Sequence, residues 1–244
     1  MTHPVVSREE WLAARRLLLE QEKEATRLLD EVRARRRALP MVAVEKDYRF
    51  TGPDGPAGLA DLFEGRRQLI VYHFMFAPDW EEGCTSCSLL VDNIGHLAHL
   101  HGADTTLALV SRAPAEKIAA FRARMGWQVP WYSSHGDDFN YDFHASNDEQ
   151  VAPVEYNYYD KAALERRGLH FFTKGEGHAA SVFVRDGDGP DARVLHSYSC
   201  YGRGPELLVG TFNYLDLTPS GRQRHISEFP HHDRYGAASG GTCH

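Results

Sequence analysis

Apolar and polar residues follow a helical repeat over the first part of the chain. From residue 7 to residue 38, apolar side chains such as Trp11 and Leu28 recur at three- and four-residue spacing. This spacing places them along one face, so it predicts a single long amphipathic helix. Ser7 and Glu10 stand three residues apart at its start, which is the spacing of a capping box.

The middle of the chain alternates between two patterns. Continuous apolar runs predict buried strands, and runs with helical spacing predict helices. Strands that alternate with helices indicate βαβ units, a parallel core sheet and right-handed crossovers. The predicted strands cover residues 69–76, 105–111 and 130–133, and the predicted helices cover residues 88–101 and 114–125.

The regular pattern then stops and resumes later as a hairpin. Residues 136–178 are rich in Asp, Asn, Tyr, Phe and His without periodicity, so we interpret them as a long insertion. Residues 180–185 and 193–198 predict two antiparallel strands, because the segment between them is rich in Asp, Gly and Pro. Residues 205–215 have helical spacing and predict a closing helix.

Charge and composition exclude several classes of partner. The chain has 244 residues and a formal net charge of −7, which disfavours a nucleic-acid partner. No apolar run approaches the roughly 20 residues that cross a bilayer, so no membrane partner is expected. The sequence after Met1 lacks a signal-peptide pattern, which makes a cytoplasmic location the expectation. Cysteines in that compartment are more often redox or metal thiols than structural disulfides.

The pair Cys84-x-x-Cys87 carries the main candidate chemistry, because it lies between a predicted strand and a predicted helix. Backbone N–H groups and the positive end of the helix dipole stabilise a thiolate at a helix start. We expect Cys84 to be the attacking nucleophile and Cys87, one turn further inward, to be the resolving thiol. The acidic residues Asp79, Glu81 and Glu82 precede the pair, and their negative charge would raise a thiol pKa.

The order of these elements resembles that of the thioredoxin superfamily, and residues 59–66 resemble the approach to the first core strand in peroxiredoxin-like proteins. From about residue 7 to 235 the chain is similar to one bacterial family of thioredoxin-like proteins. That family is of unknown function and is loosely labelled dithiol–disulfide isomerase. The segments that carry the resemblance include Tyr72-His73-Phe74-Met75-Phe76, Asp79-Trp80-Glu81-Glu82-Gly83-Cys84, Val110-Ser111-Arg112-Ala113-Pro114, Met125-Gly126-Trp127, Pro130-Trp131-Tyr132-Ser133-Ser134 and Tyr214-Leu215-Asp216-Leu217-Thr218-Pro219.

The resemblance implies an α/β fold of thioredoxin-like type. We expect three α/β/α layers, a central mixed sheet, an N-terminal helical extension and a long insertion before the C-terminal hairpin. The expected boundaries are 1–40 for the helical extension, 41–219 for the thioredoxin-like domain and 220–244 for a C-terminal tail. Thioredoxins place a proline just before this hairpin, where the present chain has Gly177-His178-Ala179 instead.

The first functional hypothesis is a thiol–disulfide oxidoreductase that acts through Cys84 and Cys87 without a cofactor. Its partner would be a small-molecule or protein thiol or disulfide. Arg112 follows the second predicted core strand, so it would lie at the carboxyl edge of the sheet, which borders the ligand crevice in open α/β folds. There it could pair with a thiolate or an anionic substrate.

Two alternatives remain open from the sequence. The first is a copper or zinc site, because two thiolates suit either metal and a histidine would complete the ligand set. His178 lies about where copper-handling thioredoxin-fold proteins have their ligand, and His73 lies on the strand that leads to Cys84 and Cys87. Each histidine could equally be structural. The second alternative is a non-catalytic scaffold that forms a homodimer through the N-terminal helix.

Overall fold

The computed structural model describes residues 3–187, 189 and 192–236. Part of the predicted hairpin turn (188, 190 and 191) and the end of the predicted tail, including Cys243, lie outside the described residues. The chain divides into two compact units, Met1–Pro40 and Met41–His244. No helix among the described residues combines the length and the apolar character needed to cross a membrane.

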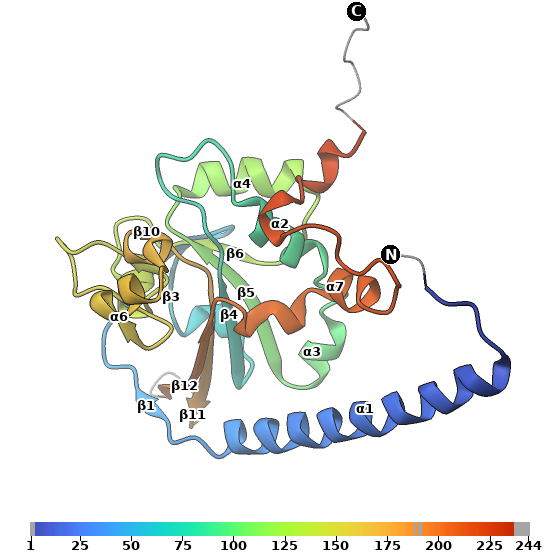
Figure 1. Cartoon of the computed structure of the whole chain (residues 1–244). Coiled ribbons are helices and arrows are strands. Elements are labelled where there is room, and N and C mark those ends of the chain that lie inside the picture. Colours follow the sequence, from blue (N-terminus) through green and yellow to red (C-terminus); the bar gives the residue numbers. More distant parts are fainter. Residues whose placement is uncertain (1–2, 188, 190–191, 237–244) are drawn as a thin grey trace, which may run out of the picture. The chain divides into compact units, whose positions relative to one another are not determined.

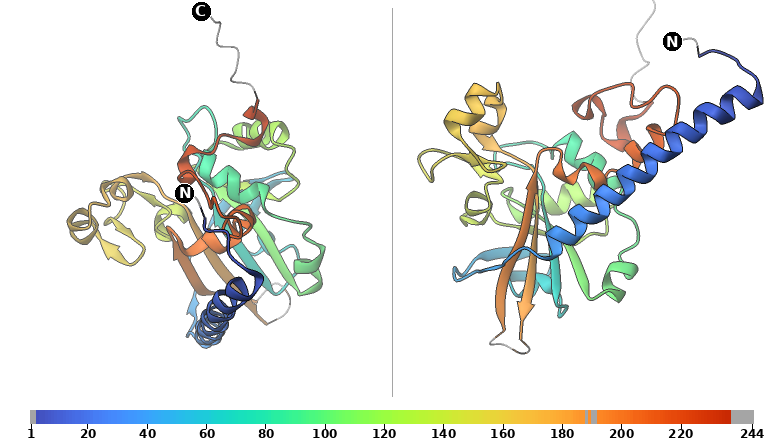
Figure 2. Two further views of the ribbon diagram at one scale, coloured as in Figure 1. Left: turned by 45° about the vertical axis from the view of Figure 1, so that its right-hand side comes forward. Right: turned by 60° about the horizontal axis from the view of Figure 1, so that its bottom comes forward.

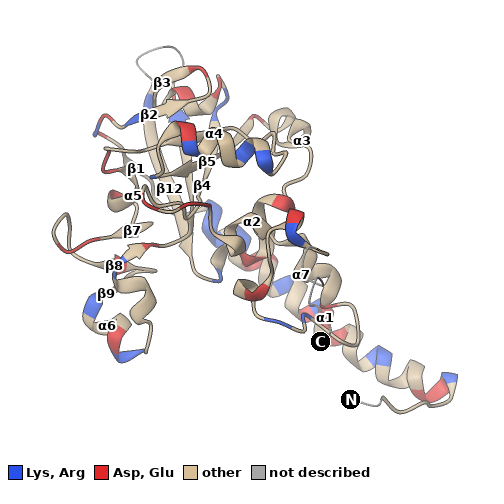
Figure 3. Cartoon of the chain, turned by 90° about the horizontal axis from the view of Figure 1, so that it is seen from above, with Lys and Arg blue, Asp and Glu red and all other residues tan. Residues whose placement is uncertain are grey.

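Helix α1 (Arg8–Arg37) confirms the long amphipathic helix that the sequence predicts. The capping box forms, since Ser7 Oγ accepts the Glu10 N–H at 3.2 Å and Glu10 Oε2 accepts the Ser7 N–H at 2.9 Å. Acidic and basic residues alternate along α1 (Figure 3). No residue of α1 is buried, and Trp11 and Leu28 are 46% and 60% exposed. The predicted homodimer contact stays a prediction.

Within the described residues, the second unit contains a mixed eight-stranded sheet (Figure 1) and two small two-stranded sheets in the insertion. The three central neighbours β4, β5 and β6 pair in parallel, and all other pairs are antiparallel. The terminal hairpin β11–β12 lies beside β4. The strands follow the order β1 (Val42–Ala43), β12 (Arg193–Tyr201), β11 (Ala179–Asp186), β4 (Gln68–His73), β5 (Thr105–Ser111), β6 (Trp131–Ser133), β2 (Arg49–Gly52) and β3 (Gly55–Gly58).

The two faces of the sheet bury separate cores, because successive side chains of a strand point to opposite sides. On β4, Tyr72 belongs to the first core and Val71 to the second. The helices α2 (Thr85–Asp92), α4 (Ala115–Arg124) and α7 (Gly210–Leu215) contribute to the first core. The short helices η1 (Asp61–Phe63) and α5 (Phe139–Asp142) cover the second. This arrangement gives the expected three layers.

Two predicted helices are each divided in the structure. The segment predicted as one helix over 88–101 contains the end of α2 and then α3 (Ala98–Gly102). Asn93 ends α2, donates its side-chain N–H to Leu89 O at 2.7 Å, and accepts the Thr211 N–H at 2.6 Å. The side-chain amide of Asn93 therefore connects the end of α2 to the start of α7. The segment predicted as a helix over 205–215 contains η3 (Gly204–Leu208) and α7.

The insertion has a small core of its own at the open end of the β11–β12 hairpin (Figure 2). The Tyr156 ring stacks on Phe172 with centroids 4.2 Å apart, and Ala179 and Tyr201 of the hairpin join this core. Gly177 is needed here, because a Cβ atom would lie 2.7 Å from the Tyr156 ring. After α5 the insertion contains β7 (Ser146–Asn147), β8 (Glu155–Tyr156), β9 (Tyr159–Asp160), α6 (Lys161–Arg166), η2 (His170–Thr173) and β10 (Gly175–Glu176).

The segment that the sequence predicts as a tail contributes to the first core. It contains the short helices η4 (Ile226–Glu228) and η5 (His232–Arg234). Phe229 packs in the first core against Phe212, with ring centroids 5.9 Å apart. His231 is only 1% exposed.

Candidate functional site

The cysteine pair lies at the start of α2, just after β4 and its continuation (Figure 1). Cys84 is the N-cap residue, and its N–H donates to Met75 O at 3.0 Å. Its carbonyl accepts the Ser88 N–H at 2.9 Å, which begins the helix. Cys84 is half-buried and Cys87 is 1% exposed, and neither thiol is in a disulfide. Cys84 is therefore partly accessible, and Cys87 lies one helical turn further inside.

The environment of Cys84 favours its thiolate and lowers its pKa to about 6. The largest cause is a hydrogen bond from the Cys87 thiol; burial opposes it. The Cys87 and Ser86 N–H groups and the Ser86 hydroxyl lower the pKa further. The Cys84 side chain makes no regular capping hydrogen bond, but these groups lie close enough to stabilise negative charge on its sulfur. The lowering outweighs the effect that we expected from the acidic residues before the pair.

The environment of Cys87 has the opposite effect and raises its pKa well above the usual range. Burial is the largest cause, and the neighbouring Cys84 adds to it. The Tyr72 hydroxyl donates a hydrogen bond to Cys87, which partly offsets the increase. The negative charge of the pair therefore resides on Cys84, and Cys87 keeps its proton.

His73 lies on the other face of the sheet from the cysteine pair. It follows Tyr72 directly on β4, so the two side chains point in opposite directions. Its ring is fully buried and packs against Phe139, with centroids 5.3 Å apart. Nδ1 lies 3.3 Å from Asn140 Oδ1 and Nε2 lies 2.9 Å from Ser181 Oγ. The structure does not bring this metal candidate to Cys84 and Cys87, because strand alternation separates them.

His178 lies in the loop before β11, and its ring also has a structural partner. Nε2 donates to Gly202 O at 2.8 Å, and the His178 carbonyl accepts the Tyr156 hydroxyl at 2.8 Å. Burial lowers the pKa of His178 below its usual value. The side chain thus ties the insertion to the end of the β11–β12 hairpin.

The metal alternative is not supported by a complete ligand set in the described residues. Cys84 and Cys87 supply two thiols, but no group of three or more His, Cys, Asp or Glu side chains within residues 3–187, 189 and 192–236 could hold a metal ion. The copper or zinc hypothesis therefore stays a prediction.

Arg112 lies at the carboxyl edge of the sheet, as expected, because it directly follows β5. Its guanidinium donates to Glu176 Oε1 at 2.8 Å and lies 4.6 Å from the centre of the Tyr141 ring. Glu176 is 5% exposed, and its other oxygen accepts the Ser146 hydroxyl at 2.6 Å. Burial raises the pKa of Glu176, and Arg112 opposes this increase. Arg112 is thus a partner of a buried carboxylate, and a role toward Cys84 stays a prediction.

Sequence reasoning missed three residues that shape this region: Tyr72, Glu176 and His231. Strand alternation could have identified Tyr72, because it places residue 72 on the same face as Phe74 and opposite His73. Glu176 lies in the aperiodic insertion, and its partner Arg112 is 64 residues away. For His231, the sequence offers one signal that the tail packs on the domain: the apolar pair Phe229-Pro230 precedes it in an otherwise polar stretch.

Comparisons with known proteins give the following findings. None of the curated proteins that were compared matches the chain. Among solved structures, a cysteine-to-serine mutant of PrxQ from Xylella fastidiosa is similar at 12% identity and a TM-score of 0.44, over 71% of this chain and 94% of that one. The bacterioferritin comigratory protein of Xanthomonas campestris, titled for its alkyl peroxide reduction activity, has 14% identity and a TM-score of 0.43, over 72% and 95%. Peroxidoxin BcpB from Mycobacterium tuberculosis has 14% identity and a TM-score of 0.38, over 72% and 97%.

The family comparison covers nearly the whole chain. Residues 1–235 match the family described as "Bacterial protein of unknown function (DUF899)". The match spans both the N-terminal helix and the unit that carries the cysteine pair. The chain therefore belongs to the bacterial DUF899 family.

Proposed function

We propose that this protein is a thiol–disulfide oxidoreductase in which Cys84 attacks and Cys87 resolves. One observation carries the proposal: the two thiols of a single helical turn have opposite environments. Cys84 is half-buried with a pKa lowered to about 6, whereas Cys87 is buried with a pKa well above the usual range. A reactive thiolate beside a protected thiol is the arrangement that two-step disulfide exchange requires.

The first step forms a mixed disulfide. The Cys84 thiolate attacks one sulfur of a substrate disulfide, the substrate S–S bond breaks, and the leaving thiolate takes up a proton from water. Cys84 is then joined to the substrate through a new S–S bond. At neutral pH most Cys84 would be ionised, because its pKa of about 6 lies below the solution pH.

The second step closes the ring between the two cysteines. Cys87 loses its proton to water and attacks the Cys84 sulfur, the bond from Cys84 to the substrate breaks, and the second substrate thiolate leaves. The substrate gains two electrons, and the dithiol becomes a disulfide that an external thiol must reduce again. The Cys84 charge that helps to keep Cys87 protonated disappears when the mixed disulfide forms. The Tyr72 hydroxyl then supports the Cys87 thiolate, because it already donates to this sulfur.

A redox titration with thiol counting tests the proposal. The purified protein is equilibrated in buffers with different ratios of reduced to oxidised dithiothreitol, alkylated, and analysed by peptide mass spectrometry. We expect Cys84 and Cys87 to lose their thiols together and reversibly. Cys84→Ser should abolish the transition. Cys200→Ser is the matched control and should leave it unchanged, because Cys200 lies on β12 and not in the pair.

The same preparation distinguishes the alternatives. It is purified without chelator, and its zinc and copper contents are measured before the titration. One metal ion per chain together with protected thiols at Cys84 and Cys87 would contradict the oxidoreductase proposal in favour of the metal hypothesis. A pair that never oxidises in any buffer, without bound metal, would favour the scaffold hypothesis.

A further inference from the structure

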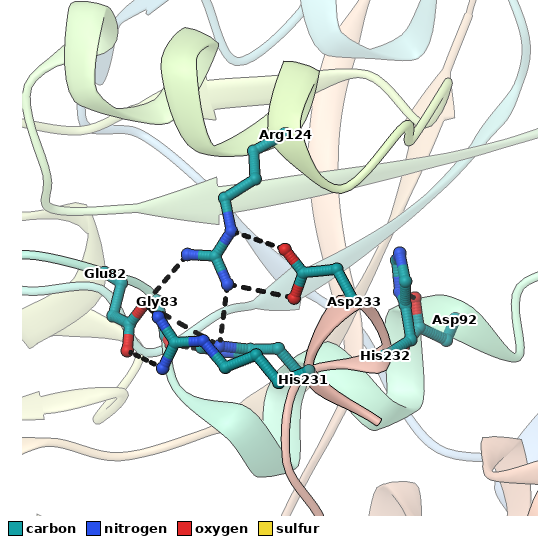
Figure 4. Close-up of polar contacts among 8 residues, drawn as sticks. Glu82, Gly83, Asp92, Arg124, His231, His232 and Asp233 are labelled. Atoms are coloured by element: carbon teal, nitrogen blue, oxygen red, sulfur yellow. Dashed lines mark hydrogen bonds and ion pairs between the residues drawn. The ribbon is translucent and has the colours of Figure 1, made fainter. Parts of the chain in front are cut away.

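The last described segment of the chain lies against the loop that leads into Cys84 (Figure 4). Phe229 fixes one end of this segment in the first core. His232 Nδ1 lies 2.7 Å from Asp92 Oδ1, on the last residue of α2. Between these two anchors, His231 reaches Gly83, which directly precedes Cys84. The segment 229–234 therefore contacts both ends of the helix that carries the cysteine pair.

The hydrogen bonds of the His231 ring define which nitrogen carries the proton. Nε2 lies 2.9 Å from Gly83 O, and Nδ1 lies 3.3 Å from Arg124 Nη2. A guanidinium has donors only, so Nδ1 accepts and Nε2–H donates to the Gly83 carbonyl. The ring is buried and meets the Phe121 ring edge to face, with centroids 5.4 Å apart. The His231 ring thus has one defined orientation, in which Nδ1 also lies 3.7 Å from Glu82 Oε2.

This hydrogen bond fixes the peptide that leads into Cys84. The Gly83 carbonyl and the Cys84 N–H belong to one planar peptide unit. His231 binds the carbonyl, and Met75 O accepts the N–H at 3.0 Å, so both sides of the plane are held. Gly83 itself touches the core, because a Cβ atom would lie 2.5 Å from the Phe74 ring. The direction of the Cys84 side chain depends on the orientation of this peptide plane.

Ion pairs hold the same segment in place and engage the carboxylate of Glu82, two positions before Cys84. Arg124 donates to Glu82 at 2.8 Å and to both oxygens of Asp233 at 2.7 and 3.0 Å. Arg234 donates to Glu82 at 2.9 and 2.7 Å. Burial acts to raise the pKa of Glu82, but the two guanidinium groups hold it below the usual range. The segment therefore also supplies positive charge to an acidic residue two positions before Cys84.

We propose that His231 is a positioning residue for the Cys84 thiol: its Nε2–H holds the Gly83 carbonyl and thereby orients the peptide that presents Cys84 at the start of α2. This inference deepens the proposed function and rests on it, because orientation matters only where Cys84 reacts. The bond acts at the backbone, so the residue itself need not touch a substrate.

The test measures the rate at which iodoacetamide alkylates Cys84 at pH 7 in the full-length chain, with folding monitored by circular dichroism. We expect His231→Phe, which fills the ring space but cannot donate, to slow alkylation by up to about tenfold, the equivalent of one hydrogen bond. His231→Gln can place an amide N–H near the same carbonyl and should stay within about twofold of wild type. His232→Phe, the matched control, breaks the contact with Asp92 alone and should also stay within about twofold.

Several outcomes would overturn the proposal. A folded His231→Phe protein with the wild-type rate would do so, and so would an equal slowing in His232→Phe, which would assign the effect to the whole segment. If His231→Phe does not fold, nitrogen-15 NMR of the wild-type histidines decides. The Nε2–H tautomer at His231 is expected, and the Nδ1–H tautomer would contradict the bond to Gly83. These measurements need no redox partner, so failure of the dithiothreitol titration alone would refute the proposed function without deciding this inference.

Discussion

Two polar clusters adjoin strand β4 on opposite faces of one sheet. The cysteine face contains Tyr72, Cys84 and Cys87, and the histidine face contains His73 with Asn140. On the cysteine face the two groups of the pair have displaced pKa values in opposite directions, and one of them is partly exposed. On the histidine face the polar side chains are linked to one another by hydrogen bonds between buried or half-buried groups.

The polar groups of the histidine face form a continuous chain of hydrogen bonds. His196 Nε2 lies 2.8 Å from Ser199 Oγ, which lies 2.8 Å from Ser181 Oγ, and Ser181 Oγ lies 2.9 Å from His73 Nε2. Nδ1–H of His73 then donates to Asn140. All four bonds can run in one direction with neutral rings. Burial lowers the pKa of His73 to about 4, so the ring stays uncharged at neutral pH. A buried titratable group is thus structural when all its hydrogen-bond partners are present. A reactive group must be accessible to a partner molecule and must keep its charge.

The largest effect that separates the two faces is expected from Cys87→Ser. A chromogenic aromatic disulfide reports both steps, in a background where Cys200 and Cys243 are replaced by serine. The wild-type pair should release two chromophores per chain, because Cys87 displaces the second one. The variant should release one and retain the other as a mixed disulfide whose lifetime is at least about 100-fold longer, because the intramolecular attack is lost. Release of two chromophores by the variant would exclude Cys87 as the resolving thiol.

The next effect concerns the histidine face and should leave the cysteine chemistry unchanged. His73→Ala removes a fully buried ring and leaves Asn140 and Ser181 each without one partner. We expect the free energy of unfolding to fall by about 3 to 4 kcal/mol, from the cavity and the unpaired polar groups together. Urea denaturation measures this loss, and alkylation of Cys84 in the folded variant should stay within about twofold of wild type. A slowed Cys84 would show that the two faces are coupled.

A smaller effect is expected from acid. The pKa of His73 is about 4 in the folded chain, below its ordinary value of 6.5. Between these values the unfolded chain binds a proton that the folded chain does not, so stability falls as the pH decreases. The stability that the uncharged His73 ring contributes is fully present above pH 6.5. As the pH decreases toward 4, the free energy of unfolding falls by up to about 3 kcal/mol.

A control variant isolates this titration from other groups. Burial also lowers the pKa values of His178 and His196, so the wild-type curve contains several contributions with the same sign. His73→Gln keeps hydrogen-bonding capacity but cannot titrate, and its loss of stability between pH 6.5 and 4 should be shallower than that of wild type. Parallel curves for the two proteins would assign the acid sensitivity to other residues.

The sequence predicted what depends on local periodicity and spacing. The capping box of α1, the strand 105–111, the hairpin and the position of Cys84 at a helix start were all predictable, because each depends on neighbouring residues. The side of the sheet on which His73 lies also follows from alternation, which places it opposite Tyr72.

The remaining features depend on contacts between distant residues. At the end of α2, the Asn93 side chain accepts the N–H of Thr211, 118 positions later. His231 reaches Gly83 across 148 positions. Glu176 acquires its partner Arg112 only when the insertion folds back onto the carboxyl edge of the sheet. Periodicity carries no information about such pairs, so these long-range contacts could not be derived from the sequence.

The pH dependence of Cys84 alkylation tests the central claim most directly. The rate of iodoacetamide modification at Cys84 is measured by peptide mass spectrometry across the range from about pH 4 to 10, which brackets the ordinary thiol pKa of about 8.5. We predict a rate that rises through an apparent pKa of about 6 and is constant at neutral pH. Cys87→Ala should shift this midpoint upward, because it removes the thiol whose hydrogen bond is the largest cause of the lowering. A wild-type midpoint at or above about 8.5 would contradict the account, because Cys84 would then be an ordinary thiol.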